Sequence, residues 1–130
     1  MLLTTCSTPC KNGHEYITFI NNSSKDIICF EKWQGKIGLN DTLLECGAGL
    51  WQIKTNKIEK FKSLSACWEG DFVVLPFIQY FVLDAAQYDE YAGEASCDTI
   101  RKYIPILQRY QLTLEDLNQM NWIITYPPEK

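Results

Sequence analysis

Hydrophobic and polar positions divide the first two thirds of the chain into short strands. Residues 15–20 alternate polar and apolar side chains, which is typical of a half-buried strand. A polar turn at 21–24 and a second apolar run at 26–30 follow, and together the two strands predict an early hairpin. Two further strands are predicted, the second of them long, apolar and central: about 50–55 and 72–83.

The spacing changes after Asp84, where helical patterns replace strand patterns. Ser96 can cap a short helix that continues to Tyr103. Thr113 can cap another, because acidic residues in its first turn favour the positive end of the helix dipole. The apolar face of this second helix has three members at three-residue spacing: Leu114, Leu117 and Met120.

A closing strand is predicted at the C-terminus. Residues 122–126 are β-branched and aromatic, and two prolines stop them. Trp122 and Tyr126 share one face of this strand, so we assign them structural roles. Strands first, helices late and one closing strand predict an α+β fold: a small antiparallel β-sheet or partial sandwich with two short C-terminal helices and a closing C-terminal strand.

Composition narrows the classes of function. The net charge is −4, and Glu59 interrupts the lysines between positions 54 and 62, which argues against nucleic acid as a partner and favours a solvated loop or strand face. No apolar run approaches the ~20 residues of a membrane-spanning helix. No motif in the sequence indicates a cofactor.

The first residues, M-L-L-T-T-C, indicate a lipid anchor. Two leucines and two small residues before Cys6 resemble the end of a bacterial lipobox, in which the cysteine is acylated and becomes the first residue of the mature protein. The alternative is an ordinary cytosolic N-terminus that happens to contain a cysteine. The lipobox interpretation makes residues 1–14 a truncated signal and tether, makes residues 15–130 a single α+β domain, and predicts a membrane partner.

A longer pattern carries a family resemblance. Residues 109–127 read R-Y-Q-L-T-L-E-D-L-N-Q-M-N-W-I-I-T-Y-P, and this run resembles the C-terminal signature of small Bacteroidales-type lipoproteins of unknown function. Residues 81–85, 96–101 and 21–23 are similar to further segments of that family. The resemblance implies a lipid-anchored protein of the cell envelope, facing the periplasm or the cell surface, and it implies no activity.

The chain departs from that family at Gln111, at Cys97 and in carrying extra cysteines in its middle. None of the six cysteines forms a C-x-x-C pair, so a thioredoxin-like motif and a zinc ribbon are unsupported. Cys46 and Cys67 bracket the third strand and are the preferred disulfide pair, although the connectivity stays open. Cys29 lies in a strand and suits a buried thiol.

The sequence gives only weak support for metal binding and for nucleophilic catalysis. Cys6, Cys10 and His14 are spaced by four, which could align zinc ligands on a helix, but a proline and a glycine within that span oppose a helix. The polar segment around His14, the only histidine, suits a tether. No nucleophile elbow is present, so we expect neither catalytic nor metal-binding residues.

Two surface features remain as candidates for binding or chemistry. Trp33 and Trp68 lie at strand ends beside glycines and are the candidate binding surface for a protein or glycan. An acidic cluster spans residues 84–98. Its simplest interpretation, which requires no function, is a solvated loop followed by a helix N-terminus. We therefore expect a non-enzymatic binding or structural accessory. The alternatives are a small hydrolase or glycan-processing enzyme that uses the acidic cluster, and an immunity-type protein that blocks a toxin.

Overall fold

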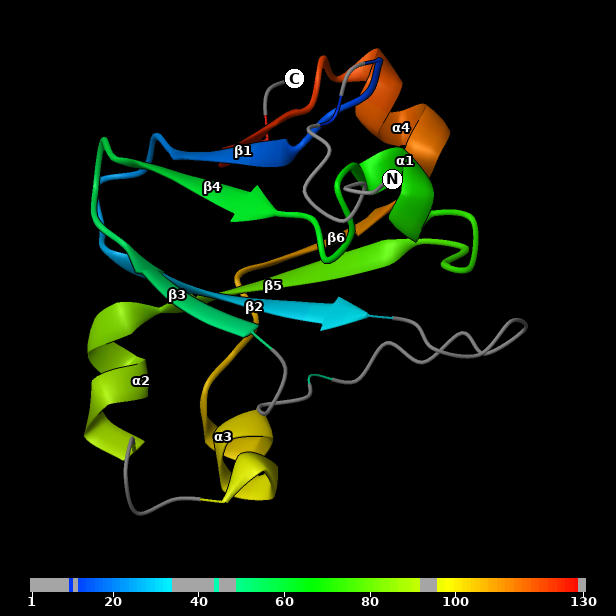
Figure 1. Cartoon of the computed structure of the whole chain (residues 1–130). Helices are drawn as coiled ribbons and strands as arrows, with labels where there is room; N and C mark the ends of the chain where they lie inside the picture. Colours follow the sequence, from blue (N-terminus) through cyan, green and yellow to red (C-terminus); the bar gives the residue numbers. More distant parts are fainter. Residues whose placement is uncertain (1–9, 11, 34–43, 45–48, 92–95, 129–130) are drawn as a thin grey trace.

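Two β-sheets face each other across the main core, and two helices cover the outer side of one of them (Figure 1). The computed structural model describes residues 10, 12–33, 44, 49–91 and 96–128. Their strands are β1 (Tyr16–Asn21), β2 (Ile27–Trp33), β3 (Gly49–Ile53), β4 (Ile58–Lys62), β5 (Ile78–Asp84), β6 (Gln108–Leu112) and β7 (Ile123–Tyr126). Their helices are α1 (Trp68–Asp71), α2 (Ala85–Tyr91), α3 (Cys97–Tyr103) and α4 (Leu114–Gln119). The predicted α+β class is confirmed.

The first sheet contains three strands in the order β4-β1-β7, and the second contains four in the order β3-β2-β5-β6. All neighbours in the four-stranded sheet are antiparallel. In the three-stranded sheet β1 is antiparallel to β4 but parallel to β7, so this sheet is mixed. The closing strand therefore lies beside the first strand of the chain, as Thr18 pairs with Ile123 and Asn21 with Tyr126.

The predicted hairpin between the first two strands is wrong, because β1 and β2 belong to different sheets. The buried Asn21 holds the corner where the chain crosses over: its side-chain amide donates to the carbonyl oxygens of Lys25 and Ile53. A second crossing, from β3 to β4, runs beside the first, and the Asn56 amide donates to the Asn21 carbonyl at 2.8 Å. Polar residues that look like a hairpin turn thus join two sheets.

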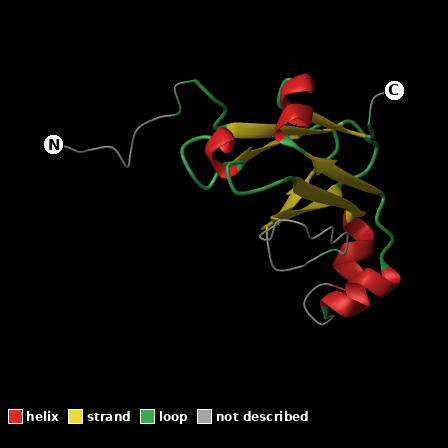
Figure 2. Cartoon of the chain, turned by 90° about the vertical axis from the view of Figure 1, so that its right-hand side faces the viewer, coloured by secondary structure: helices red, strands yellow, loops and turns green. Residues whose placement is uncertain are grey.

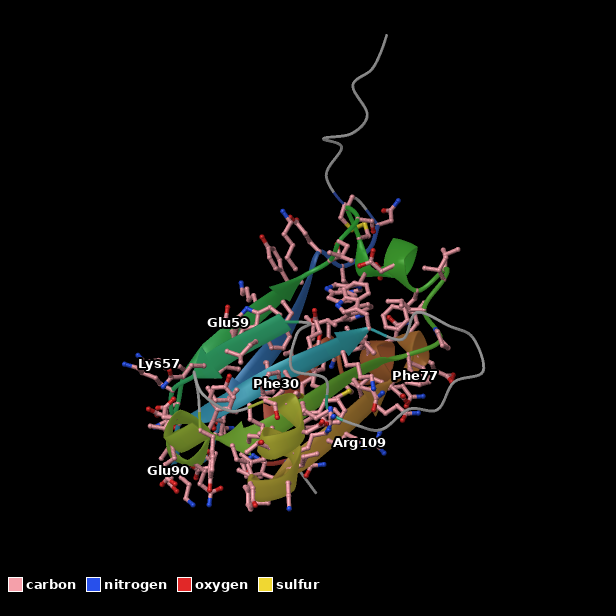
Figure 3. The ribbon with its side chains drawn as sticks, turned by 90° about the horizontal axis from the view of Figure 1, so that it is seen from below. Phe30, Lys57, Glu59, Phe77, Glu90 and Arg109 are labelled. Atoms are coloured by element: carbon pink, nitrogen blue, oxygen red, sulfur yellow. A yellow bond between two sulfur atoms is a disulfide. The ribbon has the colours of Figure 1, made fainter. Side chains whose placement is uncertain are left out.

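Two layers of apolar side chains fill the space between these elements. The larger layer lies between the sheets and includes Phe19, Phe61 and Tyr80. The smaller one lies between the four-stranded sheet and the two helices α2 and α3, where Phe30 faces the helices (Figures 2 and 3). Since β2 is buried on both faces, its first four residues form a continuous apolar run rather than an alternation, and the charged Glu31 and Lys32 that follow are buried too.

The fourth predicted strand begins later than expected. Residues 72–77 are not strand, because Phe72 caps the C-terminus of α1 and Pro76 interrupts the segment before β5 starts at Ile78. The lysine-rich segment forms β4, in which Phe61 alone is buried. Lys57 and Glu59 lie along the outer edge of the molecule (Figure 3). No helix among the residues described is long and apolar enough to cross a bilayer.

Both predicted caps are present. Ser96 accepts a hydrogen bond from the Thr99 amide at the start of α3. Thr113 and Asp116 form a reciprocal capping box at the start of α4. α4 ends at Gln119 with Met120 as its C-cap, and two successive residues with positive φ follow, Asn121 at 56° and Trp122 at 62°. Asparagine tolerates this conformation, whereas tryptophan adopts it rarely, so surrounding contacts must hold the Trp122 backbone in place.

Candidate functional site

The shortest of the described helices, α1, lies beside a disulfide and carries two carboxylates that are hydrogen-bonded. We define the α1 corner as residues 63–75 together with Cys10 and His14, which contact them. Cys67, Glu69 and Asp71 each bond to a different partner: a sulfur, an imidazole and two backbone amides. The α1 corner is therefore the place where the N-terminal segment meets the rest of the fold.

A disulfide closes this corner. Cys10 is bonded to Cys67, with a Cα–Cα distance of 5.3 Å, so Cys67 does not pair with Cys46 as the sequence suggested. Spacing around the third strand misled the prediction, because β3 stays in the four-stranded sheet whereas β4 crosses to the other sheet, pairs with β1 and brings Cys67 to the N-terminal segment. Cys97 is also disulfide-bonded, and Cys29 is a free, buried thiol. Cys6 and Cys46 lie outside the described residues.

The two tryptophans of the predicted binding surface lie together, but they form no open platform. Their rings stack with centroids 5.2 Å apart. Trp68 is 0% exposed, and its indole N–H donates to the Phe61 carbonyl at 3.0 Å, which corrects the expectation of an exposed ring. Trp33 is half-buried at the end of β2. Only Trp33 of this pair has surface that a ligand could touch.

Glu31 is a buried carboxyl beside this stack. It lies on β2 at 6% exposure, accepts from the indole N–H of Trp33 at 2.7 Å and from the Tyr80 hydroxyl at 2.8 Å. Burial raises the pKa of Glu31 and the negative charge of Asp71 adds to the rise, against the lowering effect of the two hydrogen bonds. Burial and Glu31 also raise the pKa of the Tyr80 hydroxyl. The pair fixes the end of β2 against β5.

His14 is attached to the fold rather than exposed in a loose tether. Its Nδ1 lies 2.7 Å from one oxygen of Glu69, and its backbone amide donates to the other oxygen at 2.8 Å. Its ring stacks on Trp122, with centroids 4.2 Å apart. Burial acts to raise the pKa of Glu69, but the hydrogen bonds from His14 outweigh it, so the pKa lies below the ordinary value. The contact therefore stabilises the fold above the ordinary pKa of a glutamate and weakens as the pH falls through the lowered one.

Tyr126 ends the closing strand, whereas Trp122 lies just before it, because β7 begins at Ile123, one residue later than predicted. Trp122 is 4% exposed, and its indole N–H donates to the Asn118 side chain at 3.0 Å. Tyr126 is half-buried, packs against the core between the sheets, and its carbonyl accepts from the Asn22 amide. The positive φ of Trp122 directs its ring toward α4 and His14.

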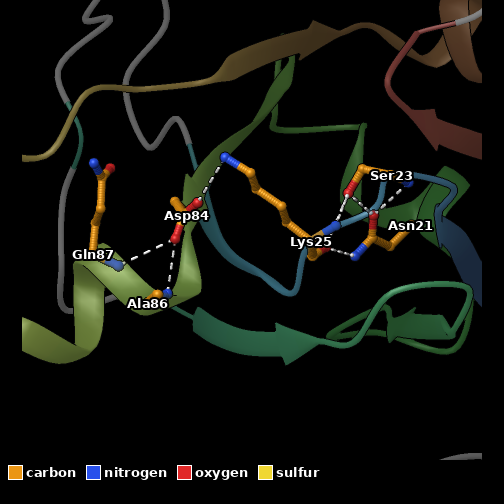
Figure 4. Close-up of polar contacts among 6 residues, drawn as sticks. All are labelled: Asn21, Ser23, Lys25, Asp84, Ala86 and Gln87. Carbon is orange, nitrogen blue, oxygen red and sulfur yellow. Dashed lines mark hydrogen bonds and ion pairs between the residues drawn. The ribbon is translucent and has the colours of Figure 1, made fainter.

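The acidic cluster of residues 84–98 serves local purposes where the structure describes it. Asp84 accepts from the amides of Ala86 and Gln87 at the start of α2 and lies 3.5 Å from the Lys25 ammonium (Figure 4). Asp98 pairs with Arg101 one turn along α3. Glu94 lies outside the described residues. Asp84 therefore caps a helix and pairs with Lys25, and Asp98 pairs within its own helix, so these two carboxylates are engaged in separate contacts.

Two hollows lie on the described surface. One, of about 530 Å³, is bordered by Lys25, Asp26, Gln52, Asp84 and Asp89. The other, of about 360 Å³, lies beside Tyr110 and Met120 at the edge of the closing strand. Both are open and shallow. Neither of these two hollows is lined by Glu31 or by the His14–Glu69 pair, whereas Tyr110, whose pKa is raised by burial, borders the second.

The described residues place one set of potential metal ligands within reach of a single ion. One group of potential donors lies close together, namely Cys10, Cys67 and Glu69. Its two sulfurs are joined in the disulfide, so they offer no thiolate to a metal ion while oxidised. The zinc arrangement of Cys6, Cys10 and His14 has no support in the described residues, since Cys10 is committed to Cys67.

Sequence reasoning missed Glu69 and Asp71, which organise the α1 corner, and the buried Glu31 on β2. Asp71 accepts from the amides of Leu64 and Ser65 and from the Ser65 hydroxyl. The S-x-S-A-C-W-E-G-D pattern carried a local signal, because serine and aspartate at this spacing favour loop hydrogen bonds. No pattern in the neighbouring sequence indicates that His14 approaches Glu69 or that Glu31 is buried.

Comparison with known proteins adds no relative. No protein-family model, no curated protein and no solved structure matches the chain.

Proposed function

We propose that this protein is a cell-envelope lipoprotein, anchored through an acylated Cys6, that acts as a non-enzymatic binding or structural accessory. The observation that carries the proposal is the disulfide between Cys10 and Cys67. Disulfides persist in exported proteins and are rare in the reducing cytosol. Cys97 is disulfide-bonded as well, so two sites in the chain favour an oxidising compartment.

The position of the first disulfide fits an anchored chain. Cys10 lies four residues after Cys6, the candidate acylation site. A bridge at that position joins the start of the folded part directly to the anchor. We infer that the bridge keeps the domain at a fixed short distance from the membrane.

The local roles of the acidic residues support a binding accessory over a hydrolase. A carboxylate-dependent enzyme holds an acid and a base at opposite sides of one substrate bond. Here Asp84 is engaged as a helix cap and Asp98 as a partner of Arg101. The proposed ligand is a protein or a glycan of the envelope, and the half-buried Trp33 is the aromatic side chain we assign to it.

The anchor is testable by expressing the chain with its natural upstream coding sequence in a bacterium that processes lipoproteins. Mass spectrometry of the membrane fraction should show acyl chains on Cys6 at a new N-terminus. Cys6→Ala should release the protein or block its processing, and Thr8→Ala, a change in the same segment, should leave both unchanged. An intact, unmodified Met1 on a protein recovered from the cytosol would contradict the proposal.

A further inference from the structure

The three most exposed large apolar side chains in the described part of the molecule lie close together in the chain. They are Leu64 at 81% exposure, Val73 at 83% and Val74 at 69%. All three belong to the α1 corner, on the two loops that flank α1. We call these three residues the apolar tip. Single exposed apolar residues need no explanation, but three in one corner indicate a contact surface.

The loops that carry the apolar tip are held in place by one residue. The buried carboxylate of Asp71 accepts from the Leu64 amide at 3.0 Å. The backbone carbonyl of the same residue accepts from the Val74 amide at 3.2 Å, and Gly70 accepts from Val73. Both loops are thus tied to the same short helix, so their exposed side chains are presented on a fixed backbone.

The apolar tip lies in the corner that holds the anchored end of the chain. Cys67, three residues after Leu64, carries the disulfide to Cys10. Only three residues separate Cys10 from Cys6, so the Cα atoms of the two cysteines are at most about 14 Å apart. The headgroup layer of each leaflet is roughly 5–8 Å thick. A tether of this length holds the α1 corner at the membrane surface.

We propose that the apolar tip inserts into the phospholipid interface, so that the domain rests on the bilayer through the α1 corner. This inference depends on the proposed anchor at Cys6. Leucine and valine side chains on an exposed corner gain by burial at the boundary between headgroups and acyl chains. α2, which carries Glu90, lies at the opposite end of the molecule from Phe77 and the α1 corner and therefore faces away from the membrane (Figure 3).

Amide hydrogen exchange tests this orientation on the acylated protein. The exchange of residues 64–75 is compared between acylated protein in phosphatidylethanolamine–phosphatidylglycerol vesicles and the Cys6→Ala chain in solution. We expect about a tenfold slowing in this segment on vesicles, the effect of burying one or more apolar side chains. Exchange in α2 should be the same in both samples.

Variants separate the apolar tip from the anchor. Serine at all three tip positions (Leu64→Ser, Val73→Ser, Val74→Ser) should abolish the slowing while the acylated protein stays on the vesicles. Ile58→Ser is the matched control, because Ile58 is 58% exposed at the far end of β4, and it should keep the slowing. Cys10→Ser should also reduce it by lengthening the tether.

Two results would overturn the inference, and they differ in what else they overturn. Acylated, vesicle-bound protein with unchanged exchange at 64–75 would exclude the docked orientation and leave the anchor intact. Protein without acyl chains on Cys6 would remove the anchor and the orientation together.

Discussion

Carboxylates have opposite uses at the two ends of the molecule. At the α1 corner Glu69 binds His14, 55 residues away, and the buried Asp71 ties two loops to one helix. At the end formed by α2 and α3, Asp84 caps its own helix and Asp98 pairs with Arg101 three residues later. Glu69 thus joins distant segments and Asp71 orders a neighbouring loop, whereas within the cluster Asp98 acts inside one helix and Asp84 combines a local cap with an ion pair to Lys25. Clustering along the chain is therefore a poor guide to the role of an acidic residue here.

Removing the indole of Trp68 should be the most damaging change at the α1 corner. The ring is fully buried, stacks on Trp33 and donates to the Phe61 carbonyl. Trp68→Ala should reduce the free energy of unfolding by about 3–5 kcal/mol, measured from the urea midpoint. Leu64→Ala, in the same corner but 81% exposed, should change it by less than about 0.5 kcal/mol. Equal midpoints for the two variants would contradict the packing described for Trp68.

Breaking the disulfide should have the next largest effect. Cys10→Ser removes a link across 57 residues and should cost about 2–4 kcal/mol in oxidised protein. Cys67→Ser and the double variant should each lose the same amount as Cys10→Ser, because all three break one bond. In the unmodified protein, alkylation without reductant followed by peptide mapping should leave Cys10 and Cys67 unlabelled. Label on both residues in protein from an oxidising compartment would refute the bridge.

A pair of isosteric changes tests the contrast between the acids directly. Asp71→Asn replaces one acceptor oxygen by a donor while two amides and a hydroxyl still need acceptors, so it should cost about 1–3 kcal/mol. Asp89→Asn, on the exposed side of α2, should stay within about 0.5 kcal/mol of wild type. Thermal unfolding of both variants measures the difference. A larger loss for Asp89→Asn would reverse the comparison.

Replacing the buried Glu31 should give the smallest change in the free energy of unfolding, and the size of this change should depend on pH. Because its pKa is raised in the fold, the folded state holds the proton more tightly than the unfolded chain does, and stability falls as the pH rises toward and through the raised pKa. Glu31→Gln keeps the shape without this titration. Relative to wild type, the variant should therefore gain stability as the pH rises from the ordinary pKa of a glutamate through the raised pKa of Glu31, as measured by paired urea titrations. Parallel pH profiles would show that Glu31 titrates normally.

Local signals explain what the sequence could predict about the fold. Thr113 and Asp116 form their capping box within one helical turn, so the pattern that predicts it lies in four residues. The Ser96 cap is local in the same way. By contrast, Asn21 resembles a hairpin turn residue, and its actual role depends on the Ile53 carbonyl, 32 residues away. Short-range patterns contain no information about that partner.

At the candidate site, too, local features could be predicted from the sequence and distant partners could not. Cys67 could be recognised as a disulfide cysteine, but its partner depends on how β3 and β4 return to the N-terminal segment. Trp68 was expected at the surface because a glycine follows two residues later, yet the ring turns inward to stack on Trp33. The apolar tip was hidden in the sequence, since the segment 72–83 looked like one buried strand and its first residues proved exposed. Exposure is decided by tertiary packing, which periodicity alone does not encode.

The parallel pairing of β1 with β7 has a consequence for the order in which the fold can form. The first strand of the chain takes its neighbour from the last, so the three-stranded sheet has a vacant edge until residues 123–126 have been synthesised. Such end-to-end contacts close late and slow the final step of folding. A nascent chain can build the four-stranded sheet earlier, because β6 ends at Leu112, and it must keep the β1 edge unpaired until residues 123–126 have emerged from the ribosome.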